Sequence, residues 1–235
     1  MSIEIRSEDE NMKPYLDHPV DLIELSKLLP HEMTIRSEIE WLIKDLKMNK
    51  ILIWPILVDK NTNLILDGHH RVFAMKELGY SKIPAHILNY DDEMIKLDTW
   101  YPVINIPTDD LINIFKETPV MVKKVEKSNL NYELLKSRNF TCYVVNEFEL
   151  YEIEGDRDKI FEIIRINFMD KITYYDNYKI ALDNTDAENT CVLAWSYGKD
   201  EVRRFAKRGG VYDPKTTRHV LPFKVKKIHY DIANL

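Results

Sequence analysis

The residues with the clearest chemical potential in this sequence form the stretch Asp67-Gly68-His69-His70-Arg71. It lies between a predicted short strand and a predicted helix, so backbone N–H groups at the helix start can bind a phosphate. Gly68 lets the backbone approach a ligand closely. His69 and His70 are adjacent, and on a helix they point about 100° apart, which argues against a shared metal site. The stretch therefore predicts a phosphate site, with a pair of structural histidines as the alternative.

A second candidate stretch runs from Asp213 to Phe223 near the end of the chain and has no helical period. It contains five consecutive residues with hydrogen-bond donors, namely Lys215, Thr216, Thr217, Arg218 and His219. Such a set makes a poor core and a good anion site. Between Lys199 and His229, ten Lys or Arg stand against three Asp or Glu, which gives a local charge of +7 within a net charge of −6. This segregation favours an anionic ligand, although for residues 199–208 a solvated helix face is the better explanation.

Two further places could complete a site. Glu32 comes just before a predicted helix, where it either complements the helix dipole or acts as a base toward a substrate hydroxyl. Thr99 and Trp100 end a predicted strand, where they either pack in the core or form one wall of a ligand pocket.

The elements that must position these residues follow from the spacing of apolar side chains. Helical spacing predicts a helix that begins after Thr34, as its N-cap, and extends through Leu46. Gly79 is expected to end the helix that follows Arg71. We expect further helices at 109–117, 131–137 and 156–169, and strands at 20–25, 55–58, 64–66, 82–90, 94–100, 140–145, 148–153 and 191–196. This order predicts a mixed α/β (α+β) protein rather than a run of βαβ units.

Composition excludes several classes of protein. The chain has 235 residues and six glycines, none of which forms G-x-G-x-x-G or a P-loop, so both glycine-rich phosphate cradles are absent. Cys142 and Cys191 are too few and too far apart for a zinc site or a disulfide framework. The longest apolar run, Ile51 to Val58, is much shorter than the roughly 20 residues that cross a membrane. We therefore expect a cytoplasmic protein with no membrane partner and, given its acidic balance, no nucleic-acid partner.

The stretch from Leu66 to Ala74 resembles the signature of the ParB/sulfiredoxin superfamily. Sulfiredoxins carry a cysteine where His69 stands, and ParB partition proteins carry a Gly-Glu-Arg-Arg box and a helix-turn-helix, which we do not find here. The sequence is most similar to the archaeal free L-serine kinases of this superfamily. The similarity is carried by Lys27–Glu32, Asp67–Arg71, Thr99–Pro102 and Lys215–Phe223, which span most of the chain.

This resemblance implies transfer of the terminal phosphoryl group of ATP or ADP to the hydroxyl of L-serine, which gives O-phospho-L-serine for cysteine synthesis. It implies that Glu32 is the general base and that Asp67 is catalytic and holds Mg²⁺, serine or both. The nucleotide phosphates would bind to Gly68, His69, His70, Arg71, Lys215, Thr216, Thr217, Arg218 and His219. The serine would bind to Thr99, Trp100 and His219.

We favour ATP over ADP because ATP is the commoner donor. The alternative function is a ParB-like nucleotide-binding regulator that associates with DNA. We expect a ParB/sulfiredoxin-like nucleotide-binding domain of residues 1–105, completed by residues 206–235, and a smaller α/β lobe of residues 106–205. The oligomeric state is left open between monomer and dimer.

Overall fold

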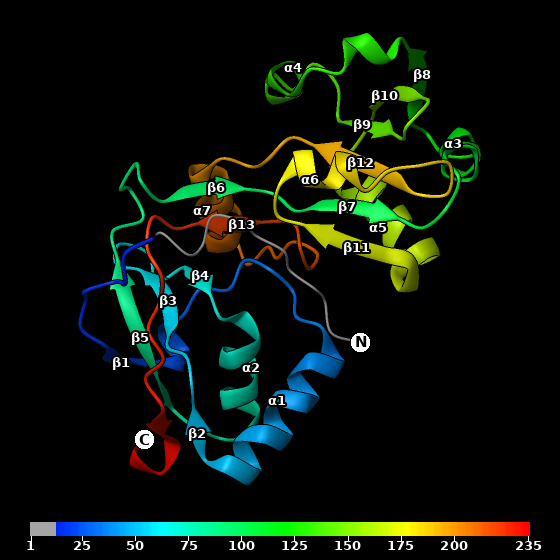
Figure 1. The fold of residues 1–235 in the computed structure, drawn as a ribbon. Helices are drawn as coiled ribbons and strands as arrows, with labels where there is room; N and C mark the ends of the chain where they lie inside the picture. Colours follow the sequence, from blue (N-terminus) through cyan, green and yellow to red (C-terminus); the bar gives the residue numbers. More distant parts are fainter. Residues whose placement is uncertain (1–12) are drawn as a thin grey trace. The chain divides into compact units, whose positions relative to one another are not determined.

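The computed structural model describes residues 13–235, and these residues form two compact units (Figure 1). The split unit comprises residues 13–98 and 197–235, and the inserted unit comprises residues 99–196. The chain therefore leaves the split unit after Asp98 and returns to it after Ser196. The predicted mixed α/β class is confirmed in both units.

A four-stranded sheet with the order β1-β5-β3-β4 is the centre of the split unit. Its strands are β1 (Asp21–Glu24), β3 (Ile56–Asp59), β4 (Ile65–Asp67) and β5 (Lys82–Leu88). β3 and β5 are parallel, whereas β1 pairs with β5 and β4 pairs with β3 in antiparallel fashion. All four residues of β3 are buried, which matches the continuous apolar run in the sequence.

Both faces of this sheet are covered. Successive strand residues point to opposite faces, so β3 contributes side chains to a core on each side. Ile56 and Val58 pack in a core with the helices α1 (Arg36–Asn49) and α2 (His69–Glu77). Leu57 packs in a second core with α7 (Lys199–Lys207). The helix predicted to extend from Thr34 through Leu46 is α1, and its apolar residues Ile39 and Leu46 are buried as the spacing predicts.

The start of α1 differs from the prediction. Ile35, not Thr34, is the N-cap residue, and no side chain caps the helix. Instead the backbone N–H of Ile35 donates a hydrogen bond to Nε2 of His70, 2.9 Å away. A contact over 35 residues of sequence replaces the local cap, and sequence spacing gives no sign of it. The predicted stop at Gly79 is confirmed, since its φ is +84° and α2 ends just before it.

The last part of the chain completes the split unit through two small sheets. β13 (Arg218–Val220) pairs with β6 (Lys96–Asp98), and β14 (Tyr230–Asp231) pairs with β2 (Ile51–Leu52). Short 3₁₀ helices occupy Leu25–Lys27 and Ile232–Asn234. This last part of the chain, residues 208–235 (the tail), is an integral part of the split unit.

The inserted unit is built on a six-stranded antiparallel sheet with the order β11-β7-β12-β9-β10-β8. The strands are β7 (Tyr101–Ile104), β8 (Met121–Val125), β9 (Cys142–Val145), β10 (Leu150–Glu154), β11 (Ile172–Tyr175) and β12 (Thr190–Ala194). The helices are α3 (Thr108–Lys116), α4 (Tyr132–Lys136), α5 (Arg157–Phe168) and α6 (Tyr178–Asp183), with 3₁₀ turns at Lys127–Asn129 and Met169–Lys171.

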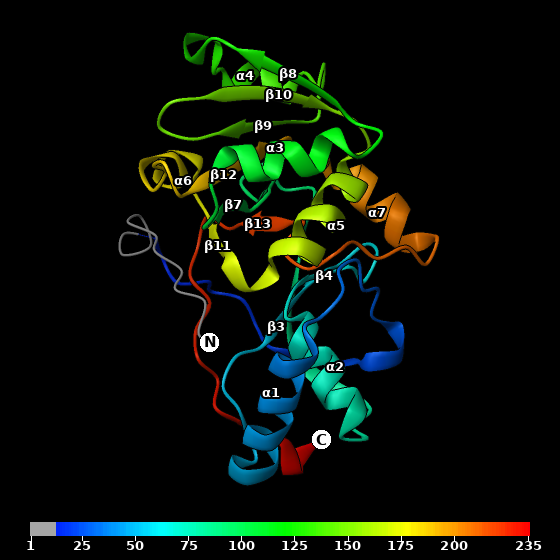
Figure 2. The same cartoon turned by 90° about the vertical axis from the view of Figure 1, so that its right-hand side faces the viewer.

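The helices of the inserted unit lie on both faces of its sheet. α3 and α5 pack with Val144 and Val192 on one face, and Figure 2 shows these two helices side by side over the sheet. α4 and α6 pack with Tyr143 and Leu193 on the other face. Both cysteines of the sequence are buried free thiols in this unit. No helix in the described part of the chain is both long enough and apolar enough to cross a membrane.

Candidate active site

The carboxylate of Glu32 accepts three hydrogen bonds from the tail. The backbone N–H of Lys215 donates to Oε1 over 2.7 Å. The backbone N–H of Thr217 and its hydroxyl donate to Oε2 over 3.0 and 2.6 Å. The tail was predicted to bind an anion, and its donors here hold an anionic group of the protein itself.

Backbone pairing brings Glu32 to the tail. The N–H of Tyr212 donates to the carbonyl of His31, and the N–H of Met33 donates to the carbonyl of Tyr212, each over 2.8 Å. Glu32 thereby lies directly opposite Tyr212, just before the tail turns. At the turn, Lys215 adopts a left-handed conformation with φ +65°. This conformation is uncommon outside glycine, and successive N–H groups in such turns commonly form a concave anion site.

Two opposing effects set the basicity of Glu32. Burial raises the pKa of the Glu32 carboxyl above its ordinary value, whereas the hydrogen bonds from Thr217 and Lys215 and the charge of Lys215 lower it. Burial dominates, so the carboxylate is a stronger base than an exposed glutamate. A carboxyl group with a raised pKa is suited to accept a proton from a substrate near neutral pH.

The predicted phosphate stretch lies at the junction of β4 and α2. Asp67 ends β4, and Gly68 is the N-cap of α2 with φ +104°. Arg71 donates to Oδ2 of Asp67 over 2.6 Å and to the carbonyl of Pro55 over 2.9 Å. Its guanidinium is thus held in one place beside the helix start, where the first backbone N–H groups of any α-helix lack intrahelical acceptors.

Gly68 is required both by its backbone and by its surroundings. A Cβ at this position would lie 2.6 Å from Cγ2 of Ile56 and 3.0 Å from the Arg71 guanidinium. Replacing Gly68 by Ala is therefore expected to lower the free energy of unfolding by about 1–3 kcal/mol. It should also raise the Kd for nucleotide by about tenfold or more, because Arg71 must move and a loss of ~1.4 kcal/mol is a factor of ten.

Urea denaturation and nucleotide titration measure the two effects of Gly68→Ala. Gly79→Ala is the matched control, since Gly79 also has a positive φ of +84° but has no atom within 4 Å of the added Cβ. That variant should lose stability only, by about 1 kcal/mol. Equal nucleotide affinity in both variants would contradict the role given to Gly68.

The adjacent histidines bracket the segment that carries Glu32. Nε2 of His69 accepts the backbone N–H of His31 over 3.3 Å, and Nε2 of His70 accepts that of Ile35 over 2.9 Å. Because both Nε2 atoms accept, both rings are neutral and keep their proton on Nδ1. Each ring therefore has one donor left for a ligand, and Glu38, 3.3 Å from Nε2 of His70, does not form an ion pair with it in this state.

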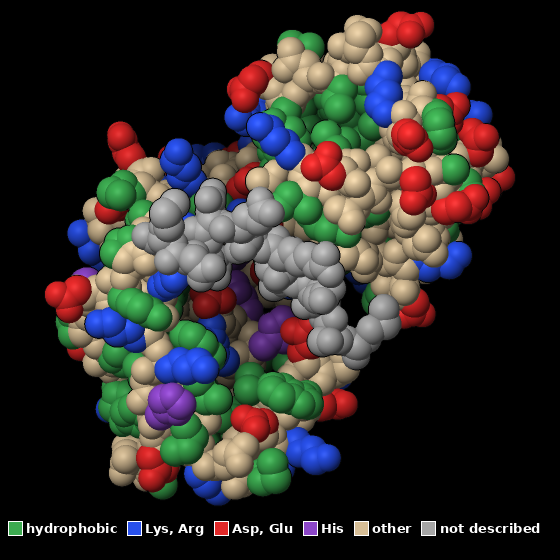
Figure 3. Space-filling view, viewed as in Figure 1, with side chains coloured by type: hydrophobic (Ala, Val, Ile, Leu, Met, Phe, Trp, Pro, Cys, Tyr) green, Lys and Arg blue, Asp and Glu red, His purple; other side chains and the backbone are tan. Residues whose placement is uncertain are grey.

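Three histidine rings and one tyrosine pack behind these contacts. The His31 ring centroid lies 4.6 Å from that of His69 and 5.5 Å from that of His219. Nε2 of His219 is 2.8 Å from the hydroxyl of Tyr90. Burial lowers the pKa of His31 to about 4 and lowers those of His69 and His219 well below the ordinary value. Figure 3 shows histidine side chains gathered near the middle of the viewed face.

The other predicted tail residues lie around this cluster. Thr216 and Thr217 are buried, and Lys215 is half-buried. β13 places Arg218 opposite Asp98 and His219 opposite Leu97. The structure thus places all the predicted phosphate-binding residues in the split unit, and among them Lys215 and Thr217 contact Glu32, whereas His69 and His219 contact His31.

Thr99 and Trp100, the predicted serine wall, belong to the inserted unit. Thr99 is fully buried, and its hydroxyl accepts a hydrogen bond from Arg157 over 3.1 Å. Arg157 also donates to the carbonyl of Trp195, and its guanidinium lies over the Phe161 and Trp195 rings. Thr99 therefore has a packing role within its own unit, and contact of this pair with serine stays a prediction.

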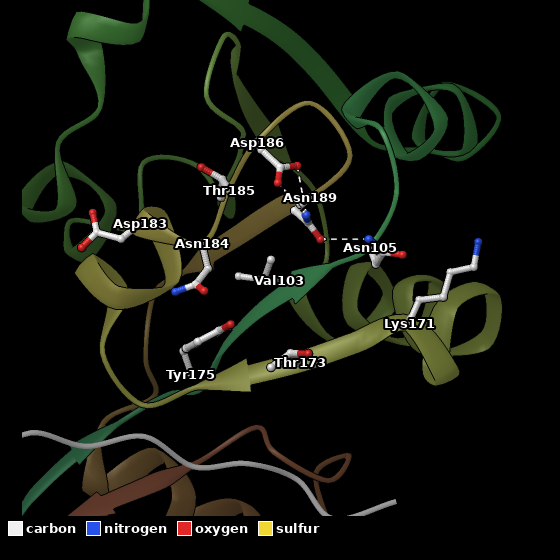
Figure 4. Close-up of a pocket in the computed structure, with 10 residues that line it drawn as sticks. All are labelled: Val103, Asn105, Lys171, Thr173, Tyr175, Asp183, Asn184, Thr185, Asp186 and Asn189. Atoms are coloured by element: carbon white, nitrogen blue, oxygen red, sulfur yellow. Dashed lines mark hydrogen bonds between the residues drawn. The ribbon is translucent and has the colours of Figure 1, made fainter.

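A polar cavity of about 330 Å³ in the inserted unit involves none of the predicted site residues (Figure 4). Three of its polar side chains bond to one another: Asn189 donates to Asp186 over 2.9 Å, and Asn105 donates to Asn189 over 3.0 Å. Figure 4 shows Asp183 pointing away from this chain of bonds. The cavity therefore does not compete with the split unit as the site of catalysis.

Two members of the cluster had no predicted role. His31 lies beside Glu32 in the sequence and within the stretch Lys27–Glu32 that carries the family resemblance, and these were the available signals. Tyr90 lies two residues after the end of β5. Its hydroxyl contacts Nε2 of His219, which is 129 residues away in the sequence. No local pattern of the sequence indicates that contact.

Comparison with known proteins gives a consistent result, although no family model matches the chain. An ATP-dependent L-serine kinase of Staphylothermus marinus is 32% identical, with 86% of this chain and 85% of that protein covered. An ADP-dependent L-serine kinase of Thermococcus kodakarensis is 30% identical, with 91% of each covered. A solved free serine kinase in complex with AMP superposes with a TM-score of 0.80 at 28% identity, covering 99% of this chain and 98% of that one.

Proposed function

The chain belongs to the family of nucleotide-dependent free L-serine kinases, and from that premise we propose that it phosphorylates the hydroxyl of L-serine to give O-phospho-L-serine. The observation that carries the proposal is the Glu32 carboxylate, which burial makes more basic and whose neighbour His31 is hydrogen-bonded to His69 in the first turn of α2. We also propose that the product serves cysteine synthesis, as the resemblance implies.

In this mechanism Glu32 takes the proton of the serine hydroxyl as the serine oxygen attacks the terminal phosphorus of the nucleotide. The bond between that phosphorus and its bridging oxygen breaks, and the nucleotide leaves with one phosphate fewer. The three donors occupy one lone pair of Oε1 and both of Oε2, so the remaining lone pair of Oε1 has a fixed direction and the base needs little rearrangement during the reaction. Phosphoryl transfer depends on positioning and on charge neutralisation, with little covalent chemistry for the protein.

The phosphates would be bound by the start of α2 and by the tail. Backbone N–H groups after Gly68, the Nδ1–H groups of His69 and His70, and the Arg71 guanidinium are all donors at this place. We assign Lys215, Thr216, Arg218 and His219 to the same anion site. Contact of the serine with Thr99 and Trp100 stays a prediction from the resemblance, and the serine carboxylate would require a cation such as Arg218.

Asp67 fits a magnesium ion that arrives with the nucleotide. Its side chain is 58% exposed and can turn from Arg71 to an incoming cation. Among the described residues, no group of three or more His, Cys, Asp or Glu could hold a metal ion alone. Mg²⁺ commonly takes one or two carboxylates together with phosphate oxygens and waters, which matches this donor set. When bound, the ion neutralises charge on the phosphates.

Replacing Asp67 by Asn is expected to raise the Mg²⁺ concentration for half-maximal activity by about tenfold, since one charged ligand is lost. Titration of activity with Mg²⁺ at saturating serine measures this. Asp91→Asn is the matched control, because Asp91 is 55% exposed and pairs with Arg203 over 2.6 Å, just as Asp67 pairs with Arg71. The same Mg²⁺ dependence in both variants would remove Asp67 as a ligand.

One assay tests the function itself. The purified protein is incubated with L-serine, Mg²⁺ and either ATP or ADP, and O-phosphoserine is detected by mass spectrometry. We expect phosphoserine with ATP. Relatives named for either donor match this chain at similar identity, so ADP is assayed in parallel. Absence of phosphoserine with both donors would overturn the proposal.

A further inference from the structure

We propose that His31 is a positioning residue for the Glu32 carboxylate and acts on it through the hydroxyl of Thr217. This inference rests on the proposed function, because it concerns how the base is kept ready. It adds a third residue to the pair formed by Glu32 and Thr217, and this residue contributes no atom to the substrate.

The three groups form a continuous chain of hydrogen bonds. The Thr217 hydroxyl lies 2.6 Å from Oε2 of Glu32 and 3.0 Å from Nε2 of His31. The last contact joins residues 186 positions apart and is buried. His31 is 1% exposed and Thr217 is 7% exposed.

Counting protons gives the direction of each bond. A hydroxyl has one proton to donate, and a carboxylate can only accept. A general base must be ionised, so Thr217 donates its proton to Glu32. The contact with His31 must then be a bond from Nε2–H of His31 to Oγ1 of Thr217, which requires the Nε2-protonated tautomer of a neutral ring.

Burial makes this arrangement matter. Without the His31 donor, the Thr217 hydroxyl would lose a buried hydrogen bond that helps to hold it toward Glu32. A donor on Thr217 also polarises its O–H group and strengthens the bond to Glu32. This stabilises the ionised carboxylate against the burial that raises its pKa.

Other charged or titratable groups also face this chain and act on it from outside. Lys215 faces Glu32 from the tail. His69 and His219 face His31, and their rings are neutral because burial lowers both pKa values. His70 and Arg71 act on His69. Burial is the largest cause of the low pKa values of His69 and His219, and His31 lowers them further; since burial remains, both rings should stay neutral in variants of His31.

Four variants separate a hydrogen-bonding role from a packing role. His31→Gln places an amide N–H close to the position of Nε2, whereas His31→Leu has similar bulk and no donor. Thr217→Ser keeps the hydroxyl, whereas Thr217→Val keeps the shape without it. For each variant, kcat and KM for serine are measured from pH 5.5 to 9.

We expect His31→Leu to lower kcat by about tenfold, with little change in KM, and to move the acidic limb of the pH profile to higher pH. His31→Gln and Thr217→Ser should retain most of the activity and the original limb. The double variant of His31→Leu and Thr217→Val should be no worse than Thr217→Val alone, because both changes break one chain. Additive losses, or an unmoved acidic limb in His31→Leu, would overturn the proposal.

The tautomer can be tested without activity. Long-range ¹H–¹⁵N spectra of the full chain with ¹⁵N-labelled histidine, assigned with His31→Gln, should show His31 protonated at Nε2. Protonation at Nδ1 would overturn the proposal even if His31→Leu failed to fold. If wild-type protein makes no phosphoserine, the proposed function fails, whereas an active wild type with a wrong tautomer refutes only the role of His31.

Discussion

Replacing Glu32 by Gln is expected to lower kcat by about 10²–10⁴-fold, which is the range that general-base catalysis contributes. The nucleotide Kd should change by a few-fold at most, because the donors proposed for the phosphates lie on α2 and on other parts of the tail. The measurement is phosphoserine formation at saturating serine and nucleotide, together with a direct binding titration of the nucleotide.

The substitution Glu32→Gln removes the negative charge and also disturbs the hydrogen bonds that Glu32 accepts. Glu32 accepts donors on both oxygens, from the Lys215 N–H on one and from the two Thr217 donors on the other. A Gln side chain has one acceptor oxygen, so its amide group must face at least one N–H. We therefore expect a loss of about 1–3 kcal/mol in the free energy of unfolding as well. Glu32→Asp, which keeps the charge and shortens the side chain, should recover stability better than activity.

Glu40→Gln is the matched control for this experiment. Glu40 is a glutamate of α1 with a 61% exposed side chain, and it pairs over 2.8 Å with Arg36. Such exposed pairs contribute about 0–1 kcal/mol, so this variant should keep wild-type kcat and nearly wild-type stability. Turnover within threefold of wild type in a folded Glu32→Gln protein would refute the role of Glu32 as the base.

Most helices and strands could be predicted from the sequence, because the apolar residues of the buried helices and of many strands follow a regular spacing. α3 and α5 bury one apolar face each, and both lie within one residue of the predicted bounds. The elements without a prediction are β8, β11, the short α6, the buried strand β7 and the short strands β2, β13 and β14. β8 and β11 are the two edge strands of the six-stranded sheet, and their residues are exposed or only half-buried. Edge strands lack burial on both faces, so their sequences show no clear apolar pattern.

Most residues of the candidate site could be predicted from the sequence, but their hydrogen-bond partners could not. The donors of Asp67–Arg71 and of the tail could be recognised by residue type. Their actual partners depend on contacts between distant segments, such as the one between His31 and Thr217. The tail donors were expected to face a ligand, and several of them hold Glu32 instead, because backbone pairing at Tyr212 places that carboxylate opposite the turn. Long-range pairing of this kind has no local signature.

The second large expected effect is a steep loss of stability of the split unit below about pH 6.5. His31, His69 and His219 are buried as neutral rings, and burial lowers their folded-state pKa values from an ordinary value of 6.5, for His31 to about 4. In the unfolded chain these groups take up protons at higher pH than in the folded chain. The stability they contribute is therefore fully present above pH 6.5 and is lost as the pH falls.

The expected size follows from proton linkage. Each group that differs in this way changes the free energy of unfolding by about 1.4 kcal/mol per pH unit, so three histidines together give about 4 kcal/mol per unit. Glu32 acts in the opposite direction, because its folded-state pKa is raised and the folded chain holds its proton more tightly. The net slope should be about 3 kcal/mol per unit, against a typical total stability of 5–15 kcal/mol.

Hydrogen exchange read out by peptide mass analysis between pH 7.5 and 5, corrected for the intrinsic exchange rate, measures the opening of the split unit separately from that of the inserted unit. The protection of β3 and β5 should fall steeply with pH, because these strands form the centre of the split unit. His31→Gln removes one titrating ring and should reduce the slope by about 1.4 kcal/mol per pH unit. His229→Asn is the control, since His229 is exposed with φ +46°, a conformation that Asn tolerates, and its slope should equal that of wild type. A slope near zero in the wild-type protein between pH 6.5 and 5 would show that these histidines are not held neutral by the fold.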